Sequence, residues 1–225
     1  MSNLIVRGFL IAVIVCSSGV SLFAQKFELN GYAGFVFPTS DSLANFENSN
    51  IFGGKVGVYV THNLEIEGSF GYINRFNLKT DPNPANGVFG ITRPATRAYL
   101  YDAMVTWNFA SRRTLGTTVA PFITFGAGGL QAGIVDASTI PIQGAGFTFD
   151  SSGAVVPSPD VPIVLENDDK FLTLSYGGGV KAERLWGPMG LRADIKGRTI
   201  PNFFGKAINW LPEITGGVNF TWGEP

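Results

Sequence analysis

Only one side chain in the sequence has the chemistry of a general base near neutral pH, and it stands alone. His62 is the single histidine of the chain, and it lies in Thr61-His62-Asn63, a tight polar connection between two apolar stretches. Nucleophilic catalysis by serine needs a histidine and an acid within hydrogen-bond reach. No such set accompanies His62, so we interpret it as a solvated turn residue. We expect no catalytic residue and no enzyme activity.

The sequence gives equally little support for a metal or cofactor site. Cys16 is the only cysteine, and there is no cluster of histidines or thiols for zinc. Acidic residues gather between positions 136 and 169, where a solvated loop is favoured over calcium binding because the spacing matches no ligand loop. The glycines at 126–129 and 177–179 precede no helix, so they are not phosphate loops. We expect no cofactor and no metal.

The charged residues follow a different pattern, in which they recur at every second position. Arg192, Asp194, Lys196 and Arg198 keep a strict spacing of two, which places them on one face of a β-strand. The same parity in the other strands predicts an inward-facing polar network with both signs of charge. Its predicted members are Glu28, Lys55, Glu65, Glu67, Asp102, Lys181, Glu183, Arg192, Asp194, Lys196, Arg198 and Glu213.

Such a set would be costly in the apolar core of a soluble protein unless every charge were paired. In a narrow polar lumen it can form a hydrogen-bonded network of ion pairs. An eight-stranded barrel is only wide enough for side chains to fill it. We therefore expect a plugged interior, and a gated proton or ion path is the alternative.

Eight segments of the chain show this alternation and position the charged residues. Their opposite faces are apolar, which fits strands that face hydrocarbon on one side and a polar interior on the other. The connections between them run long, short, long, short, long, short, long, as in an up-and-down barrel with short inner turns and long outer loops. The predicted fold is an all-β, eight-stranded antiparallel up-and-down transmembrane β-barrel. The predicted strands cover residues 27–37, 52–60, 64–72, 96–109, 119–131, 169–183, 189–199 and 211–222.

The longest predicted loop, 132–168, contains a small hairpin at 147–156. If that hairpin joined the wall, the barrel would have ten strands, and this is the main structural alternative. Aromatic residues fall toward both ends of the predicted strands, as expected of the two interfacial belts of a spanning barrel. Phe27, Trp107, Phe109 and Trp222 form the predicted inner belt, and Phe35, Phe37, Phe70, Tyr72, Tyr99, Tyr101 and Trp210 the outer one.

The N-terminal segment has the organisation of an export signal. Arg7 precedes an apolar run and then the small-residue segment 17–24, which predicts a signal peptide at 1–24 and a barrel domain at 25–225. A lipoprotein with Cys16 lipidated is the alternative. The net charge of −1 argues against nucleic acid as a partner.

The last strand carries a resemblance to a known family. Thr215, Gly217, Phe220 and Trp222 stand in the order polar, glycine, apolar, aromatic, which resembles the C-terminal assembly signal of bacterial outer-membrane barrels, although Gly223-Glu224-Pro225 follows here. With the alternating strands and the inward charges, the chain resembles the small outer-membrane β-barrel protein family of the OmpA transmembrane domain, OmpX and Ail-like barrels. The resemblance implies outer-membrane location, outer-membrane lipid and the assembly machinery as partners, and a scaffold that presents surface loops.

Three functions follow as hypotheses. The first is a non-enzymatic structural or surface-interaction scaffold, with loop 132–168 as the contact surface. The second is a narrow OmpW-like channel for small apolar molecules, because Leu100 and Met104 point inward and Phe122 and Leu130 are candidates to do so. The third is a soluble exported lipid-binding barrel.

Overall fold

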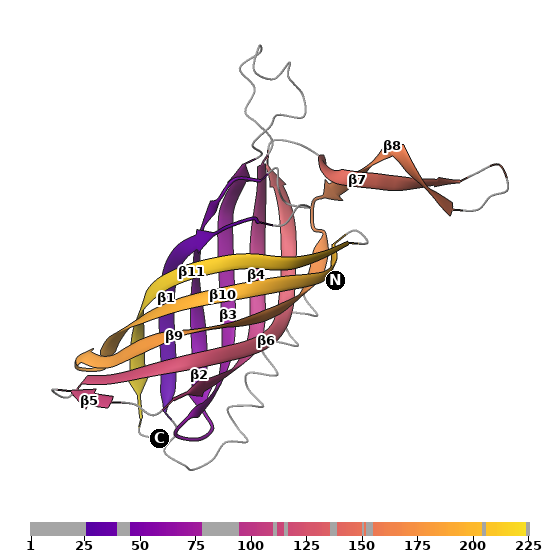
Figure 1. The fold of residues 1–225 in the computed structure, drawn as a ribbon. Coiled ribbons are helices and arrows are strands. Elements are labelled where there is room, and N and C mark those ends of the chain that lie inside the picture. The colour runs from indigo at the N-terminus through magenta and orange to yellow at the C-terminus, as the bar shows by residue number, and fades with distance from the viewer. Residues whose placement is uncertain are drawn as a thin grey trace, which may run out of the picture.

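The described chain is built from antiparallel strands (Figure 1). The computed structural model describes residues 26–39, 46–77, 95–109, 112–114, 117–135, 139–149, 151, 155–203 and 206–223. Eight long strands form the wall: β1 (Phe27–Val36), β2 (Ser49–Tyr59), β3 (Leu64–Asn77), β4 (Ala95–Asn108), β6 (Thr117–Val135), β9 (Lys170–Trp186), β10 (Met189–Phe203) and β11 (Lys206–Trp222). The short β5 (Arg112–Thr114) pairs with the start of β6. No helix in the described part of the chain is long and apolar enough to cross a membrane.

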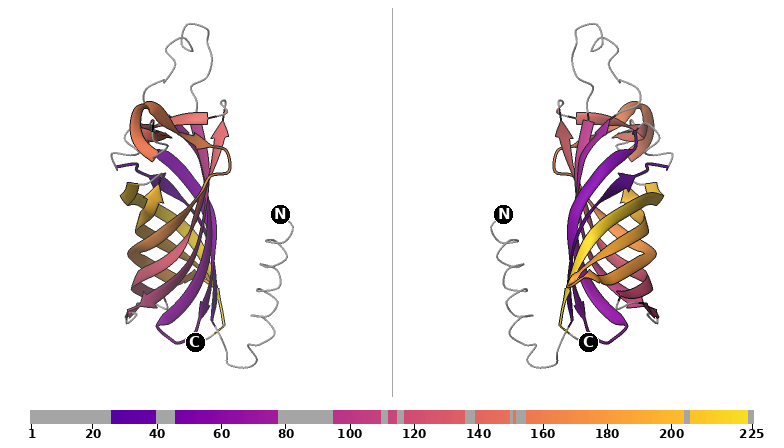
Figure 2. Two further views of the ribbon diagram at one scale, coloured as in Figure 1. Left: turned by 90° about the vertical axis from the view of Figure 1, so that its right-hand side faces the viewer. Right: turned by 90° about the vertical axis from the view of Figure 1, so that its left-hand side faces the viewer.

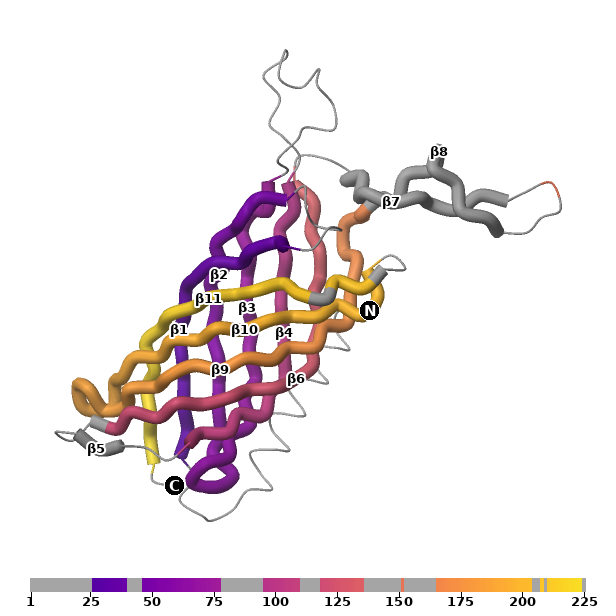
Figure 3. Tube along the Cα trace, viewed as in Figure 1, coloured from indigo at the N-terminus to yellow at the C-terminus, as the bar shows by residue number. Residues whose placement is uncertain are grey.

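The wall closes on itself. Each long strand pairs with the next in order, β1 also pairs with β11, and β4 pairs with β6 across the place that β5 occupies in the sequence. Figures 2 and 3 show the resulting tilted cylinder from three directions. The predicted eight-stranded antiparallel barrel is confirmed.

The two ends of the barrel differ in their connections. We call the end that carries residues 60–63 and the Gly187-Pro188 turn the turn end. Gly187 has a φ of 64° there, which a glycine adopts without steric cost. Lys26 and Gly223, next to the outer limits of β1 and β11, also lie at the turn end. The opposite end, where β1 ends and β2 begins and where β6 connects to β9, is the loop end.

Buried and exposed side chains alternate along most of the wall strands. β1 shows this clearly, with Phe27 and Leu29 exposed and Glu28 and Asn30 buried. The exposed positions of the wall are mostly large and apolar, and the buried ones include many charged residues. This distribution is the inverse of that of a soluble protein, in which charged residues are almost never fully buried unless they are paired.

The strands are longer at the loop end than the alternation predicted. β3 continues to Asn77, β6 to Val135 and β10 to Phe203, and β11 begins at Lys206. The segment 200–210 was predicted as a long connection, and this is wrong, because Phe203 pairs with Lys206 across only two intervening residues. Register shifts between Arg198 and Phe203 interrupt the ladder there.

The predicted hairpin at 147–156 is part of a larger one. β7 (Thr139–Phe149) and β8 (Val155–Glu166) pair only with each other and form a separate two-stranded sheet, so the ten-stranded alternative is wrong. Backbone and side-chain bonds attach its base to β6. Ala132 N donates to Asp169 O at 2.8 Å, and Ile134 N donates to Asn167 Oδ1 at 3.1 Å.

Candidate functional site

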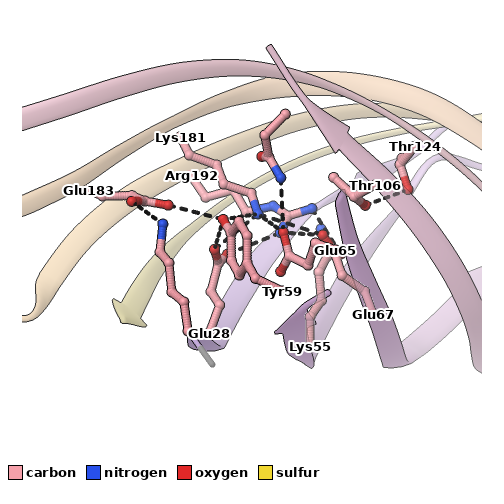
Figure 4. A network of polar contacts seen from close by, with 12 residues as sticks. Glu28, Lys55, Tyr59, Glu65, Glu67, Thr106, Thr124, Lys181, Glu183 and Arg192 are labelled. Carbon is pink, nitrogen blue, oxygen red and sulfur yellow. Dashed lines mark hydrogen bonds and ion pairs between the residues drawn. The ribbon is translucent and has the colours of Figure 1, made fainter. Parts of the chain in front are cut away.

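The turn-end half of the lumen holds a cluster of ion pairs centred on Lys181 and Arg192 (Figure 4). Lys181 Nζ from β9 donates to Glu28 Oε2 at 2.9 Å and to Glu65 Oε2 at 2.5 Å. Arg192 from β10 makes a two-pronged contact with Glu67, with Nη1–Oε1 at 2.9 Å and Nη2–Oε2 at 3.0 Å. Such bidentate pairs are among the strongest hydrogen-bonded charge pairs in proteins.

Further pairs extend this cluster on both sides. Lys55 on β2 donates to Asp194 Oδ1 on β10 at 2.7 Å, and Arg192 Nη2 donates to the same oxygen at 3.0 Å. Toward the turn end, Lys26 Nζ donates to Glu183 Oε2 at 2.5 Å. The Tyr59 hydroxyl donates to the other oxygen of Glu183 at 3.1 Å.

A second cluster lies closer to the loop end and is organised by Arg198. Its Nη1 donates to Asp102 Oδ1 at 2.6 Å, and its Nε donates to Glu213 Oε2 at 3.2 Å. Lys196 Nζ forms an ion pair with Glu213 Oε1 at 3.0 Å, although the two groups are not aligned as a hydrogen bond. Ser69 and Ser175 donate to the two oxygens of Asp102, which leaves that carboxylate well satisfied.

All twelve residues of the predicted network lie inside the barrel, and none is more than 6% exposed. The structure brings them together in these two clusters. Five hydrogen-bonding partners were not among the predicted members, namely Lys26, Tyr59, Ser69, Asn108 and Ser175. The signal that could have found Lys26 is its parity, because it shares the inward face of β1 with Glu28 and Asn30.

The pairs join opposite sides of the wall. Glu28, Lys55, Glu65 and Glu67 come from β1, β2 and β3, and their partners come from β9 and β10. Buried charges that are paired and hydrogen-bonded in this way avoid the large cost of an isolated ion in a low dielectric. The arrangement is that of cross-braces through the lumen.

The loop-end half of the lumen is apolar, which the charge pattern did not reveal. We call this region the apolar chamber. It is a continuous cluster of buried side chains from the wall and from two flanking segments. Its members are Tyr32, Val36, Phe46, Ile51, Ile73, Phe76, Ala98, Leu100, Leu130, Ala132, Ile134, Leu165, Ile200, Phe203, Ile208 and Leu211. Of the four inward apolar residues expected from the sequence, Leu100 and Leu130 belong to it, and Met104 and Phe122 are buried in the lumen.

The chamber contains a cavity of about 50 Å³ that is lined by apolar side chains and by Thr96. Ala98, Ala132, Ile200 and Ile208 contribute to its wall, and Phe46 and Leu165 contribute from outside the eight wall strands. Phe171 and Phe203 also line it, with ring centroids 4.8 Å apart.

The remaining predicted site residues occupy the last strand. Thr215 is buried in the lumen, and Trp222 is 48% exposed on the outer surface. The Phe220 and Trp222 rings stack with centroids 6.0 Å apart, and Trp222 pairs with Phe27 across the seam between β1 and β11. The assembly role of Thr215, Gly217, Phe220 and Trp222 stays a prediction.

His62 is exposed in the 60–63 connection. Among the described residues, no group of three or more histidine, cysteine or acidic side chains is placed to hold a metal ion. The predicted signal peptide at 1–24 lies outside the described residues.

A closed barrel of eight strands, apolar outside and charged inside, defines a class: the chain has the fold of the small outer-membrane β-barrels, as the resemblance predicted. No family model and no curated protein matches the sequence. Similar solved structures include the N-terminal β-barrel domain of Pseudomonas aeruginosa OprF, at 13% identity and a TM-score of 0.49, covering 88% of this chain and 97% of that one.

Neisserial surface protein A is similar at 13% identity and a TM-score of 0.48, with 87% and 96% of the two chains covered. A major outer membrane protein from Thermus thermophilus is similar at 14% identity and a TM-score of 0.46, with 89% and 100% covered. Similarity at this level carries no information about function.

Proposed function

We propose that the protein is an outer-membrane β-barrel that acts as a non-enzymatic scaffold. Its lumen is closed by the ion-pair network, and its loop end presents the segment 132–168 as a surface for interaction. The observation that carries this proposal is the cross-bracing of the lumen, in which β1, β2 and β3 are tied to β9 and β10 by buried ion pairs.

The outer surface supports location in a membrane. Phe35 is 55%, Phe125 59% and Leu172 61% exposed, and these side chains belong to a band of apolar residues around the wall. Monomeric soluble proteins rarely expose contiguous apolar patches of this extent. A soluble exported lipid-binding barrel would need a polar outer face, so this alternative has less support.

A narrow channel for small apolar molecules is the second candidate, and the apolar chamber is the observation that favours it. A through-path would have to cross both ion-pair clusters between the chamber and the turn end. The scaffold is therefore the better-supported function.

Cell fractionation tests the location. Inner and outer membranes are separated, washed with carbonate, and analysed in SDS with and without boiling. We expect a carbonate-resistant outer-membrane band whose mobility changes on heating, because a closed barrel resists SDS until its hydrogen-bonded ladder is melted. A soluble periplasmic band without a shift would contradict the membrane proposal.

Single-channel recording in planar bilayers tests the closed lumen. We expect no steady conductance from the wild-type barrel. Met104 is 2% exposed in the lumen, so Met104→Glu would place a charge in any apolar path, and Met104→Leu is the control. A steady conductance of the wild-type protein that is lost in Met104→Glu and kept in Met104→Leu would contradict the scaffold proposal and favour the channel.

A further inference from the structure

The interior changes its chemistry halfway along the barrel, and the geometry of a sheet does not require this change. Toward the turn end, inward positions carry the ion-pair network. Beyond Arg198 on β10 and Glu213 on β11, the inward positions become Ile200, Ile208 and Leu211, which are at most 2% exposed. A lumen that only had to be plugged could have continued its polar pattern.

The floor of the apolar chamber is formed by apolar side chains next to the Arg198 cluster. Leu100 and Leu211 are 1% and 2% exposed, and the Arg198 cluster lies beyond them. Asp102 and Glu213 are already engaged by Arg198. A polar group that reached this depth would lose its hydration, whereas an apolar group would meet mainly apolar side chains, with Thr96 also in the lining.

The cavity matches a slender apolar group. Its volume of about 50 Å³ makes it a small cavity. Apolar cavities without hydrogen-bonding partners stay dry and take up apolar guests. The end of an alkyl chain is a small apolar group of the kind that such a cavity takes up.

Two residues that line the cavity belong to segments outside the eight wall strands. Phe46 precedes β2, and its neighbour Glu47 is attached through N to Asn77 O at 2.9 Å. Leu165 lies near the end of β8, where the hairpin returns to the wall. Both side chains line the cavity, so movement of these segments would widen its outer side without breaking the sheet.

We propose that the apolar chamber is a blind binding pocket for the apolar end of a single alkyl chain. The chain enters from the loop end past Phe46 and Leu165 and stops above Arg198, and its head group remains outside. This inference goes beyond the scaffold function and differs from the channel, because nothing passes through the barrel.

The test uses the full-length barrel in lipid nanodiscs, with methyl groups labelled for NMR and sodium decanoate as the probe. Ile200, Ile208 and Leu211 report on the chamber, and Ile195 and Ile214 face outward and report on the lipid. We expect saturable shifts of the chamber methyl groups. The outward methyl groups should shift only gradually, as decanoate dissolves in the bilayer.

The strands provide a matched pair of variants. Ala98→Val on β4 fills the cavity, because Ala98 lines it and is 3% exposed. Ala103→Val makes the same change on the outer face of the same strand, where Ala103 is exposed. We expect Ala98→Val to weaken decanoate binding at least tenfold and Ala103→Val to leave it unchanged. Ala132→Val, at the register partner of Ala98, serves if Ala98→Val loses the heat-dependent gel shift.

Chamber methyl groups that do not shift, or that shift equally in the cavity-filled variant, would overturn the proposal. Neither result would bear on the scaffold, which is tested by conductance and fractionation.

Discussion

Together with Lys181, Arg192 is one of the two residues that connect the turn-end cluster. It contacts Glu28, Glu67 and Asp194 at 3.1 Å or less, and it is 3% exposed. Removing one partner of a buried ion pair leaves the other charge without compensation. We therefore expect residues with several ion-pair partners to contribute more to stability than residues with one.

Arg192→Met is expected to lower the free energy of unfolding by roughly 3–5 kcal/mol, the usual cost of breaking a buried pair. The double variant Arg192→Met/Glu67→Met should recover part of this loss, because it removes an orphaned charge as well. Urea unfolding in lipid vesicles, followed by the gel shift, measures both. Lys170→Ala, at an exposed position of β9, is the control, and a single variant as stable as this control would contradict the proposed role of Arg192.

At the scale of strands, the sequence allowed the fold to be predicted wherever the two faces of a strand differ in polarity. The middle of β4 is such a place, with Asp102 and Thr106 inward and Tyr101 and Val105 outward. Near the loop end the inner face no longer carries charged residues, since Ile200 and Ile208 face the chamber. The alternation then disappears, and with it the signal for the ends of β10 and β11.

The apolar chamber was missed for the same reason. Its members come from widely separated segments, so only the closed register shows that Ala98 lies opposite Ala132. The charged residues were easier to predict, because a charged side chain on a strand that borders hydrocarbon is stable only on the inner face. The pairing of individual charges depends on the tilt and closure of the barrel. The alternation along each strand does not predict that pairing.

The β7–β8 hairpin is expected to be dispensable for the barrel. Its two strands pair only with each other, so replacing residues 141–163 by a short Gly-Ser linker removes no hydrogen bond of the wall. The variant should keep the heat-dependent gel shift and its urea midpoint. Loss of the shift would show that the hairpin contributes to the wall, contrary to the register.

At the scale of the whole molecule, the outward tryptophans define where the barrel sits in a bilayer. Trp107, Trp186 and Trp222 lie toward the turn end and Trp210 toward the loop end, and each is 44–64% exposed. Amphipathic rings favour the headgroup level of a membrane. The two belts therefore mark the two interfaces.

Single-tryptophan variants in vesicles with brominated lipids measure this placement. We expect Trp210 and Trp222 to be quenched more by bromine close to the headgroup than by bromine at the chain ends. Ile195→Trp, near the middle of β10 on the outer face, should show the opposite order. Equal quenching at all three positions would argue against a barrel that spans the bilayer.

The connectivity of the ion pairs also limits how the protein can reach its membrane. Glu28 and Lys181 are separated by 153 positions in the chain, and Lys55 and Asp194 by 139. Early and late strands thus hold complementary halves of one set of charges. A partly formed sheet that entered the hydrocarbon would expose Arg192 and its acidic partners to lipid, at a cost of several kcal/mol for each ion. We therefore expect insertion into the membrane to occur together with the pairing of β1 and β11. The charges are then neutralised as the barrel closes.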